Sequence, residues 1–354
     1  MSRHVENISL PADLSAFDEI IDARSPGEFA EDRISGAVNL PVLNDAERSE
    51  VGTIHKQVSA FDARKIGAAL VSRNIAHHLE THLANKPKDY RALVYCWRGG
   101  QRSGSLATVM NDVGWDVSLI SGGYKAYRSL VVEVIETRAP ALKLVVLNGY
   151  TGAGKTLLLA ELDRIGEQVI DLEGMANHKG SVFGGDPHAP QPAQKQFESL
   201  LYEKLKQIDL DRPVYIEAES AKIGRLNLPN PIWKKLKSSP VIEVDSPVEA
   251  RARYLAGDYG EWVGNLDRVH ETIDRLSGFH SKATLARWKT MTEAGEWHPF
   301  VTELLTEHYD NRYTVDGSGN YPVPSATVPL SSHDPDSIAA ATKEISKLGP
   351  PLLL

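Results

Sequence analysis

The 354-residue chain contains a single cysteine, Cys96. One thiol cannot form an internal disulfide, and there is no group of cysteines to hold zinc or an iron–sulfur cluster. The fold must therefore be held by packing, and we expect no bound redox cofactor. A lone cysteine is either a small buried apolar side chain or a reactive group, and its neighbours distinguish the two.

The sequence also lacks long apolar runs and an excess of basic residues. Its start has no apolar segment of signal-peptide length, and no stretch approaches the roughly 20 apolar residues of a membrane span. We therefore expect a cytoplasmic protein with no membrane partner. Asp and Glu (47) outnumber Lys and Arg (39), and the net charge of −8 argues mildly against nucleic-acid affinity of the chain as a whole.

Short apolar runs alternate with helical patterns along both halves of the chain, which predicts an α/β fold with mostly parallel sheets. The length suggests two domains at roughly 150 residues each. Pro140 ends a predicted helix at 124–137, so we place the boundary there. The predicted domains are 1–138 and 139–315, and residues 316–354 form a C-terminal extension whose last six residues are expected to be loosely held.

The residues around Cys96 favour a reactive thiol. Cys96 ends a predicted strand, and a helix is predicted to follow the loop. Backbone N–H groups of a glycine-rich loop, the helix N-terminus and the charges of Arg98 and Arg102 would all favour the thiolate. A buried structural cysteine is the alternative, but it would not need two arginines and two glycines nearby. The loop consists of Cys96, Trp97, Arg98, Gly99, Gly100, Gln101, Arg102 and Ser103.

A second loop matches the phosphate-binding pattern G-x-x-x-x-G-K-[ST]. It lies between a predicted strand at 142–147 and a helix, the context that the pattern requires. Its N–H groups and Lys155 would bind a diphosphate or triphosphate, and the Thr156 hydroxyl would bind Mg²⁺. The loop consists of Gly149, Tyr150, Thr151, Gly152, Ala153, Gly154, Lys155 and Thr156.

Carboxylates end two further predicted strands of this half. Glu217 and Glu219 are two residues apart and so share one side of an extended chain, where they can bind Mg²⁺ or act as acid or base. Asp171 and Glu173 follow the neighbouring strand in a similar way. The next loop carries His178, Lys179 and Ser181 as candidate substrate contacts, because ligands of α/β proteins bind above the carboxyl ends of parallel strands.

One segment departs from the acidic average. Residues 222–256 carry a net charge of +4 and include Trp233, which can stack on a base. A solvated helix face is an equally good interpretation of these charges. The candidate nucleic-acid contacts are Lys222, Arg225, Lys234, Lys235, Lys237, Arg251 and Arg253.

The first half resembles the rhodanese domain. The matching features are Asp22-x-Arg24 with Glu28-Phe29, the turn at 36–41, the Cys96 loop and Gly122-Gly123. The resemblance covers about residues 15–130 and implies that Cys96 carries sulfur or selenium as a persulfide or perselenide. We interpret Asp22, Arg24 and Glu28 as a structural salt-bridge cluster rather than as catalytic groups.

A rhodanese-like half joined to a phosphate-loop half resembles the bacterial tRNA 2-selenouridine synthase family. Further matching segments are 171–181, 216–220 and 307–310. The resemblance implies a rhodanese-like parallel-sheet domain followed by a P-loop NTPase-like α/β domain. It implies a transferase that geranylates the wobble 2-thiouridine of tRNAs for Lys, Glu and Gln from geranyl diphosphate, then introduces selenium from selenophosphate. A selenium-donor enzyme is an expected partner.

Three alternatives remain at this point. The spacing from Cys96 to Arg102 is Cys-x5-Arg, which is also the loop of cysteine-based phosphatases and arsenate reductases. The phosphate loop also fits an ATPase or kinase that carries a rhodanese sulfur-carrier domain. In the third alternative, the rhodanese half serves only as a docking module for sulfur or selenium.

Overall fold

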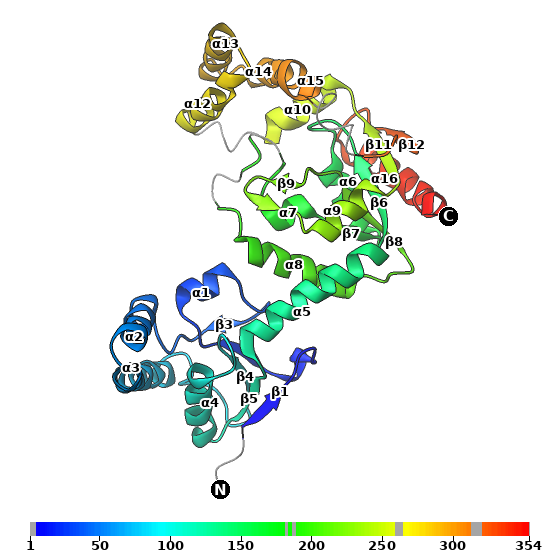
Figure 1. Ribbon diagram of the computed structural model, residues 1–354. Coiled ribbons are helices and arrows are strands. Elements are labelled where there is room, and N and C mark those ends of the chain that lie inside the picture. Colours follow the sequence, from blue (N-terminus) through cyan, green and yellow to red (C-terminus); the bar gives the residue numbers. More distant parts are fainter. Residues whose placement is uncertain (1–4, 181–182, 186–188, 259–264, 313–320, 354) are drawn as a thin grey trace. The chain divides into compact units, whose positions relative to one another are not determined.

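The computed structural model describes residues 5–180, 183–185, 189–258, 265–312 and 321–353. The chain divides into two compact units (Figure 1). Unit 1 comprises residues 1–134 and 193–203, and unit 2 comprises residues 135–192 and 204–354. Each unit is built on its own five-stranded sheet, so the two are described separately.

Unit 1 contains a parallel sheet in the order β1-β5-β4-β2-β3. Its central strand β4 is buried at four of five positions, as expected for a parallel strand covered on both faces. The strands are β1 (Glu6–Ile8), β2 (Glu19–Asp22), β3 (Val38–Asn39), β4 (Arg91–Tyr95) and β5 (Asp116–Ile120). The helices are η1 (Leu14–Ala16), α1 (Pro26–Glu31), α2 (Asp45–Gln57), α3 (Ala60–Glu80), α4 (Gln101–Val113) and the first part of α5 (Gly123–Arg138).

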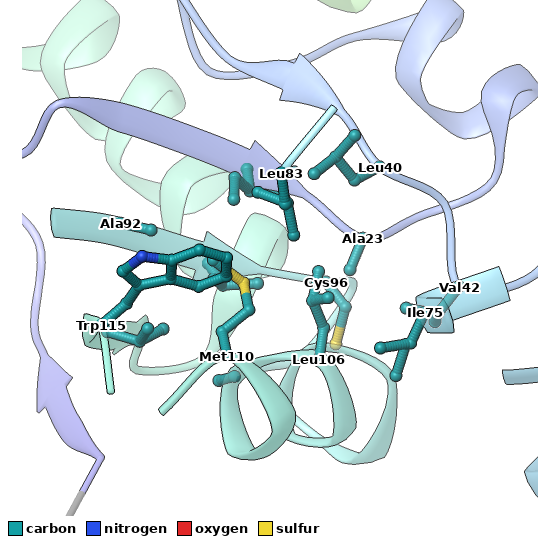
Figure 2. Packing of buried hydrophobic residues seen from close by; sticks show 14 of the residues in the cluster. Ala23, Leu40, Val42, Ile75, Leu83, Ala92, Cys96, Leu106, Met110 and Trp115 are labelled. Atoms are coloured by element: carbon teal, nitrogen blue, oxygen red, sulfur yellow. The ribbon is translucent and has the colours of Figure 1, made fainter. Parts of the chain in front are cut away.

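The main core of unit 1 extends to the carboxyl end of β4. Figure 2 shows the Cys96 side chain among Ala23, Ile75 and Leu106. Residues 193–203, which contain most of α8 (Gln194–Gln207), also belong to this unit. There the Ser199 hydroxyl donates a hydrogen bond of 3.0 Å to the buried Asp32. A segment that follows the phosphate loop by about forty residues therefore packs on the cysteine-bearing unit.

Unit 2 contains a parallel sheet in the order β12-β11-β6-β8-β7. Its strands are β6 (Lys143–Asn148), β7 (Gln168–Ile170), β8 (Pro213–Glu217), β11 (Val241–Asp245) and β12 (Ala326–Pro329), with a small hairpin of β9 (Lys222–Ile223) and β10 (Leu226–Asn227). The helices associated with the sheet are η2 (Ala139–Ala141), α6 (Lys155–Arg164), α7 (Leu172–Ala176), α9 (Asn230–Lys237), α10 (Val248–Asp258), α16 (Pro335–Leu348) and η7 (Pro350–Leu353).

A helical segment of unit 2 has a separate core around the fully buried Trp288. It consists of α12 (Leu266–Asp274), η3 (Arg275–Gly278), α13 (Lys282–Glu293), α14 (Trp297–Glu303), the π-helix η4 (Leu304–Tyr309) and α15 (Asp310–Arg312). The sequence predicts a helical stretch at 261–293 with a break at Gly278. The break is confirmed, while residues 261–264 lie outside the described part of the chain.

The end of the chain corrects one expectation. The last residues were expected to be loosely held, but Leu352 and Leu353 pack against the sheet core of unit 2. Strand β12 of the same extension pairs with β11 and was not expected in a stretch rich in Gly, Ser and Pro. Over the described residues, no helix is both long and apolar enough to span a bilayer.

Candidate functional site

Cys96 lies directly after β4 and only 3% of it is exposed. Burial alone would raise the pKa of its thiol, but hydrogen bonds outweigh that effect and lower the pKa. The Ser103 hydroxyl donates to the Cys96 Sγ at 3.2 Å, and the N–H groups of Ser103, Arg98 and Gly100 contribute further. The loop at the start of α4 therefore stabilises a sulfur anion, as the sequence predicts for its glycines and its helix N-terminus.

Two glycines allow this loop to lie close to the backbone after β5. A Cβ added at Gly99 would lie 2.7 Å from the Ile120 carbonyl oxygen, and one at Gly123 would lie 2.3 Å from the Cys96 carbonyl oxygen. The same carbonyl accepts a hydrogen bond of 2.8 Å from the Tyr124 N–H. Both glycines have positive φ, so a side chain at either would be strained as well as crowded. The Gly-Gly motif that supported the rhodanese resemblance thus fixes the cysteine loop.

The two arginines of the loop lie in different surroundings. Arg102 forms an ion pair of 2.6 Å with Glu28, and Arg98 is exposed. The largest effects that lower the pKa of Cys96 come from the Ser103 hydroxyl and backbone N–H groups, with burial opposing them. Arg102 therefore holds the loop against α1, and its guanidinium is partly neutralised by Glu28. Trp97 is partly exposed, with its ring 5.3 Å from that of Tyr124, and Gln101 begins α4.

The predicted salt-bridge cluster is confirmed for two of its three members. Asp22 and Arg24 form a fully buried ion pair of 2.6 Å, and Arg24 also donates to the Asp32 carbonyl oxygen. The Arg24 guanidinium lies over the Tyr124 ring at 3.9 Å. These groups satisfy one another inside the unit, which is a structural role. Glu28 belongs instead to the cysteine loop through Arg102.

The phosphate loop lies between β6 and α6, as predicted. Gly149, Gly152 and Gly154 all have positive φ, with values of 150°, 78° and 88°. The Lys155 ammonium donates a hydrogen bond of 2.7 Å to the Gly149 carbonyl oxygen, so it folds back across its own loop. This is the loop-and-helix arrangement in which N–H groups and an ammonium bind phosphate.

Arg251 holds this loop from outside, which corrects its expected role as a tRNA contact. Only 2% of it is exposed, and it forms a bidentate ion pair with Asp310 at 2.9 and 2.7 Å. It also donates to the Thr151 carbonyl oxygen at 3.2 Å and lies 5.1 Å from the centre of the Tyr150 ring. A buried and fully engaged guanidinium is not available to RNA.

Two further contacts hold the loop that the sequence did not reveal. A Cβ at Gly154 would lie 2.9 Å from the His333 ring, which stacks on Tyr254 with centroids 4.6 Å apart. A Cβ at Gly152 would lie 2.7 Å from Leu255. Tyr254 and Leu255 follow Arg251 by three and four residues, so one face of α10 supports the loop. Only that helical spacing could have pointed to them.

Carboxylates gather beside the loop. The Thr156 hydroxyl donates to Glu173 at 3.3 Å. Burial, reinforced by the negative charge of Asp171, raises the pKa of Glu217 to about 8. Burial and repulsion from Glu173, with which it shares a hydrogen bond, raise the pKa of Glu219 well above its usual value. Asp171 itself caps α7. At neutral pH this cluster therefore holds protons that a bound cation would displace.

Metal geometry is not preformed in this cluster. Across the described residues, no three His, Cys, Asp or Glu side chains are arranged to hold a metal ion. The donor set near the loop nevertheless suits Mg²⁺ chemically, because it consists of the Thr156 hydroxyl and the Glu173 and Glu219 carboxylates. Mg²⁺ binding stays a prediction.

The remaining predicted contacts lie on the surface of unit 2 or outside the described residues. His178 lines a pocket, the Lys179 N–H donates to the Gly184 carbonyl oxygen, and Ser181 lies outside the described part. Lys235 is half-buried, and the other predicted tRNA contacts apart from Arg251 are exposed. These are Lys222, Arg225, Lys234, Lys237 and Arg253. Lys237 lies 5.2 Å above the Trp233 ring, so an aromatic side chain does accompany this charge.

Known domain families match parts of both units. The model of the rhodanese-like domain matches residues 9–130, and that of the tRNA 2-selenouridine synthase AAA domain matches residues 142–281. Three similar proteins, each named tRNA 2-selenouridine synthase, come from Nitrosomonas europaea, Nitrosomonas eutropha and a Sulfurovum species. They are 38%, 38% and 37% identical, over 73%, 77% and 83% of this chain and 68%, 72% and 87% of their own lengths. The chain belongs to the tRNA 2-selenouridine synthase family.

Proposed function

We propose that this chain converts the wobble 2-thiouridine of tRNAs for Lys, Glu and Gln to 2-selenouridine in the cytoplasm. Geranyl is first transferred from geranyl diphosphate to sulfur, and selenium from selenophosphate then replaces the S-geranyl group. The observation that carries the proposal is Cys96, a buried thiol whose pKa is lowered by the hydrogen bonds of its own loop. It stands in a chain that also contains a complete phosphate loop, so each step has a suitable site.

The first step is assigned to the phosphate loop. The C–O bond of geranyl diphosphate breaks, a bond forms between geranyl C1 and the uridine sulfur, and diphosphate leaves. The N3 proton of the thiouridine is lost, so a base must accept it. Lys155 and the loop N–H groups would bind the leaving diphosphate. A bound cation would displace protons from the carboxylate cluster, and Glu217 in its carboxylate form would then accept the N3 proton. Thr156, Glu173 and Glu219 would hold Mg²⁺, which supplies further positive charge to the diphosphate.

The second step is assigned to the cysteine loop. Selenium bonds to C2 of the uridine, the C2–S bond breaks and geranylthiol leaves, while the phosphoryl group of selenophosphate passes to water. Geranylation helps because an alkylated sulfur leaves more readily than the thiocarbonyl sulfur it replaces. The Cys96 thiolate, stabilised by the Ser103 hydroxyl and the loop N–H groups, would displace geranylthiol from C2, and the selenide released from selenophosphate would then displace Cys96. Selenium stays at the selenide level throughout, so this step needs no oxidant.

The proposal is tested by incubating the purified chain with 2-thiouridine tRNA and analysing the nucleosides of the product. Geranyl diphosphate alone should give S-geranyl-2-thiouridine, and subsequent selenophosphate should give 2-selenouridine. Neither product should form from ATP and selenophosphate without geranyl diphosphate. An unchanged tRNA together with ATP hydrolysis would overturn the proposal in favour of an ATPase or kinase with a carrier domain.

A further inference from the structure

Unit 2 contains a pocket of about 250 Å³ that the steps above do not use. Its wall is formed by Asn177, His178, Gly185 and residues 189–191 from the segment after α7, by Arg225 of the β9–β10 hairpin and by Arg268 near the start of α12. This volume lies below the roughly 300–1,000 Å³ that is typical of small-molecule pockets, so the pocket would hold only one part of a larger ligand. Its polar lining residues are Asn177, His178, Gln191, Arg225 and Arg268.

Part of the pocket wall is held by a network of hydrogen bonds. The Gln191 amide donates to the carbonyl oxygens of Ala176 and Ile223 and accepts from the Arg225 N–H at 2.8 Å. A Cβ at Gly224 would lie 2.3 Å from the Gln191 Oε1, so the hairpin packs tightly on this amide. The pocket is thus largely preformed, and a ligand would bind with little ordering cost.

His178 presents a polar atom that lacks a partner. Its Nδ1 is buried and makes no hydrogen bond within the described part of the chain. Each nitrogen of an imidazole ring can donate or accept a hydrogen bond, depending on the tautomer. An unpaired buried polar atom is costly, and a ligand with a complementary polar edge would remove that cost.

The charge of the pocket favours an anion. Arg225 and Arg268 both line it. Arg225 uses part of its guanidinium on the Gln191 and Pro192 carbonyl oxygens, but a guanidinium carries five N–H groups in all. Two arginines beside an imidazole match a group that combines one phosphate with a polar heterocyclic edge. A nucleotide unit of single-stranded RNA has this composition.

The pocket adjoins the phosphate loop. His178 is close enough to Glu173 for that carboxylate to raise its pKa, and Glu173 accepts a hydrogen bond from Thr156. Gly180 lies over the same carboxylates, because a Cβ there would be 2.7 Å from both Glu173 and Glu219. A ligand in the pocket would therefore lie beside the diphosphate site, where an acceptor has to be.

We propose that this pocket is the acceptor subsite of unit 2, in which Arg225 and Arg268 bind an RNA phosphate and His178 binds the edge of an unstacked base. The inference rests on the proposed function, because it assumes that RNA is the acceptor at the phosphate loop. It adds which residues recognise that acceptor.

The test measures binding of the full chain to a fluorescent anticodon stem-loop RNA as a function of salt. His178→Ala and Arg268→Ala should each weaken binding by about tenfold, the effect of one hydrogen bond to a charged or buried group. Arg268→Ala should also reduce the salt slope by about one phosphate contact, whereas His178→Ala should leave the slope unchanged. The exposed Arg164 on α6 provides the matched control, and Arg164→Ala should bind like the unmodified chain.

Three further measurements separate the outcomes. The affinity for geranyl diphosphate should stay within about twofold in both variants. The melting temperatures of His178→Ala and of the more conservative His178→Gln show whether either variant is misfolded. Uridine 5′-monophosphate should compete with the RNA better than inorganic phosphate does. Equal competition would reduce the pocket to an anion site and overturn base recognition, and RNA affinities equal to that of Arg164→Ala would overturn the subsite. If RNA binding depends on His178 but no geranyl is transferred, the proposed function fails while the RNA site stands.

Discussion

The cysteine loop of unit 1 and the phosphate loop of unit 2 share one backbone design. Each follows a central strand of a parallel sheet, β4 or β6, and each leads into a helix that begins within the loop. They differ in where the negative charge is located. The cysteine loop surrounds an anion of its own, the Cys96 sulfur, whereas the phosphate loop surrounds a place for the charge of a ligand. The same N–H geometry can therefore activate a nucleophile or bind a leaving group.

The two loops are also held by similar contacts of different strength. An ion pair between Arg102 and Glu28 holds the cysteine loop, with 21% and 13% of the side chains exposed. An ion pair between Arg251 and Asp310 holds the phosphate loop, with 2% and 21% exposed. Arg102 belongs to its loop and pairs with a residue of α1, whereas Arg251 contacts the phosphate loop from α10. The more deeply buried Arg251 should matter more to stability, because desolvated charges are costly when unpaired.

Cys96→Ser provides the sharpest separation of the two loops. The hydroxyl is a far weaker nucleophile than a thiolate, so 2-selenouridine formation should be abolished. S-geranylation should continue at the rate of the unmodified chain, because the phosphate loop is unchanged. Nucleoside analysis after each step measures both activities. Loss of both in a variant with an unchanged melting temperature would show that the loops do not serve separate steps.

Asp310→Asn should lower the free energy of unfolding more than any other substitution proposed for these two loops. It leaves the buried Arg251 charge without its anion, which typically costs about 3–5 kcal/mol of unfolding free energy. Urea denaturation measures the loss, and Arg251→Met in the same background should recover part of it. Arg253→Ala removes an exposed pair with Glu249 on the same helix and should change stability by less than about 1 kcal/mol. If Asp310→Asn and Arg253→Ala lower the free energy of unfolding equally, the buried pair of Arg251 and Asp310 does not stabilise the phosphate loop.

These long-range contacts mark the limit of what the sequence could predict. Strand–helix alternation and the glycine patterns predicted both loops, because backbone geometry depends on neighbouring residues. The partner of Arg251 lies 59 residues away and that of Arg102 lies 74 residues away, so only tertiary packing selects them. A basic stretch therefore suggested that Arg251 contacts RNA, although packing buries it beneath the phosphate loop.

For the acidic groups of unit 2, the sequence predicted their position but not their surroundings. The spacing of Glu217 and Glu219 predicted that they share a side of the chain, but not that burial raises the pKa of both. The position of His333 over Gly154 could not be predicted at all, because the extension that carries it has no recognisable motif.

Lys155→Ala tests whether the phosphate loop binds the negative charge of a ligand. Removing one charged hydrogen-bond donor typically costs about 1.5–3 kcal/mol, so geranyl diphosphate affinity should fall roughly 10- to 150-fold. Calorimetry measures that affinity. Lys143→Ala removes another lysine of unit 2, which bonds to a carbonyl oxygen away from the loop, and should leave affinity unchanged. If the two variants bind equally well, Lys155 has no part in the diphosphate site.

Ser103→Ala should have the smallest effect, and it tests how the cysteine loop activates sulfur. The Ser103 hydroxyl is the strongest of the contacts that lower the pKa of Cys96 against the opposing effect of burial. Without it the pKa of Cys96 should rise, because one hydrogen bond to the sulfur is lost while burial is unchanged. Less thiolate is then present at any pH below that pKa, so the pH profile of iodoacetamide alkylation should move to higher pH. Ser105 lies on the same helix but bonds to the Gln101 carbonyl oxygen, so Ser105→Ala should leave the profile in place. A shift in both variants would mean that helix stability, and not the hydroxyl on sulfur, sets the reactivity of Cys96.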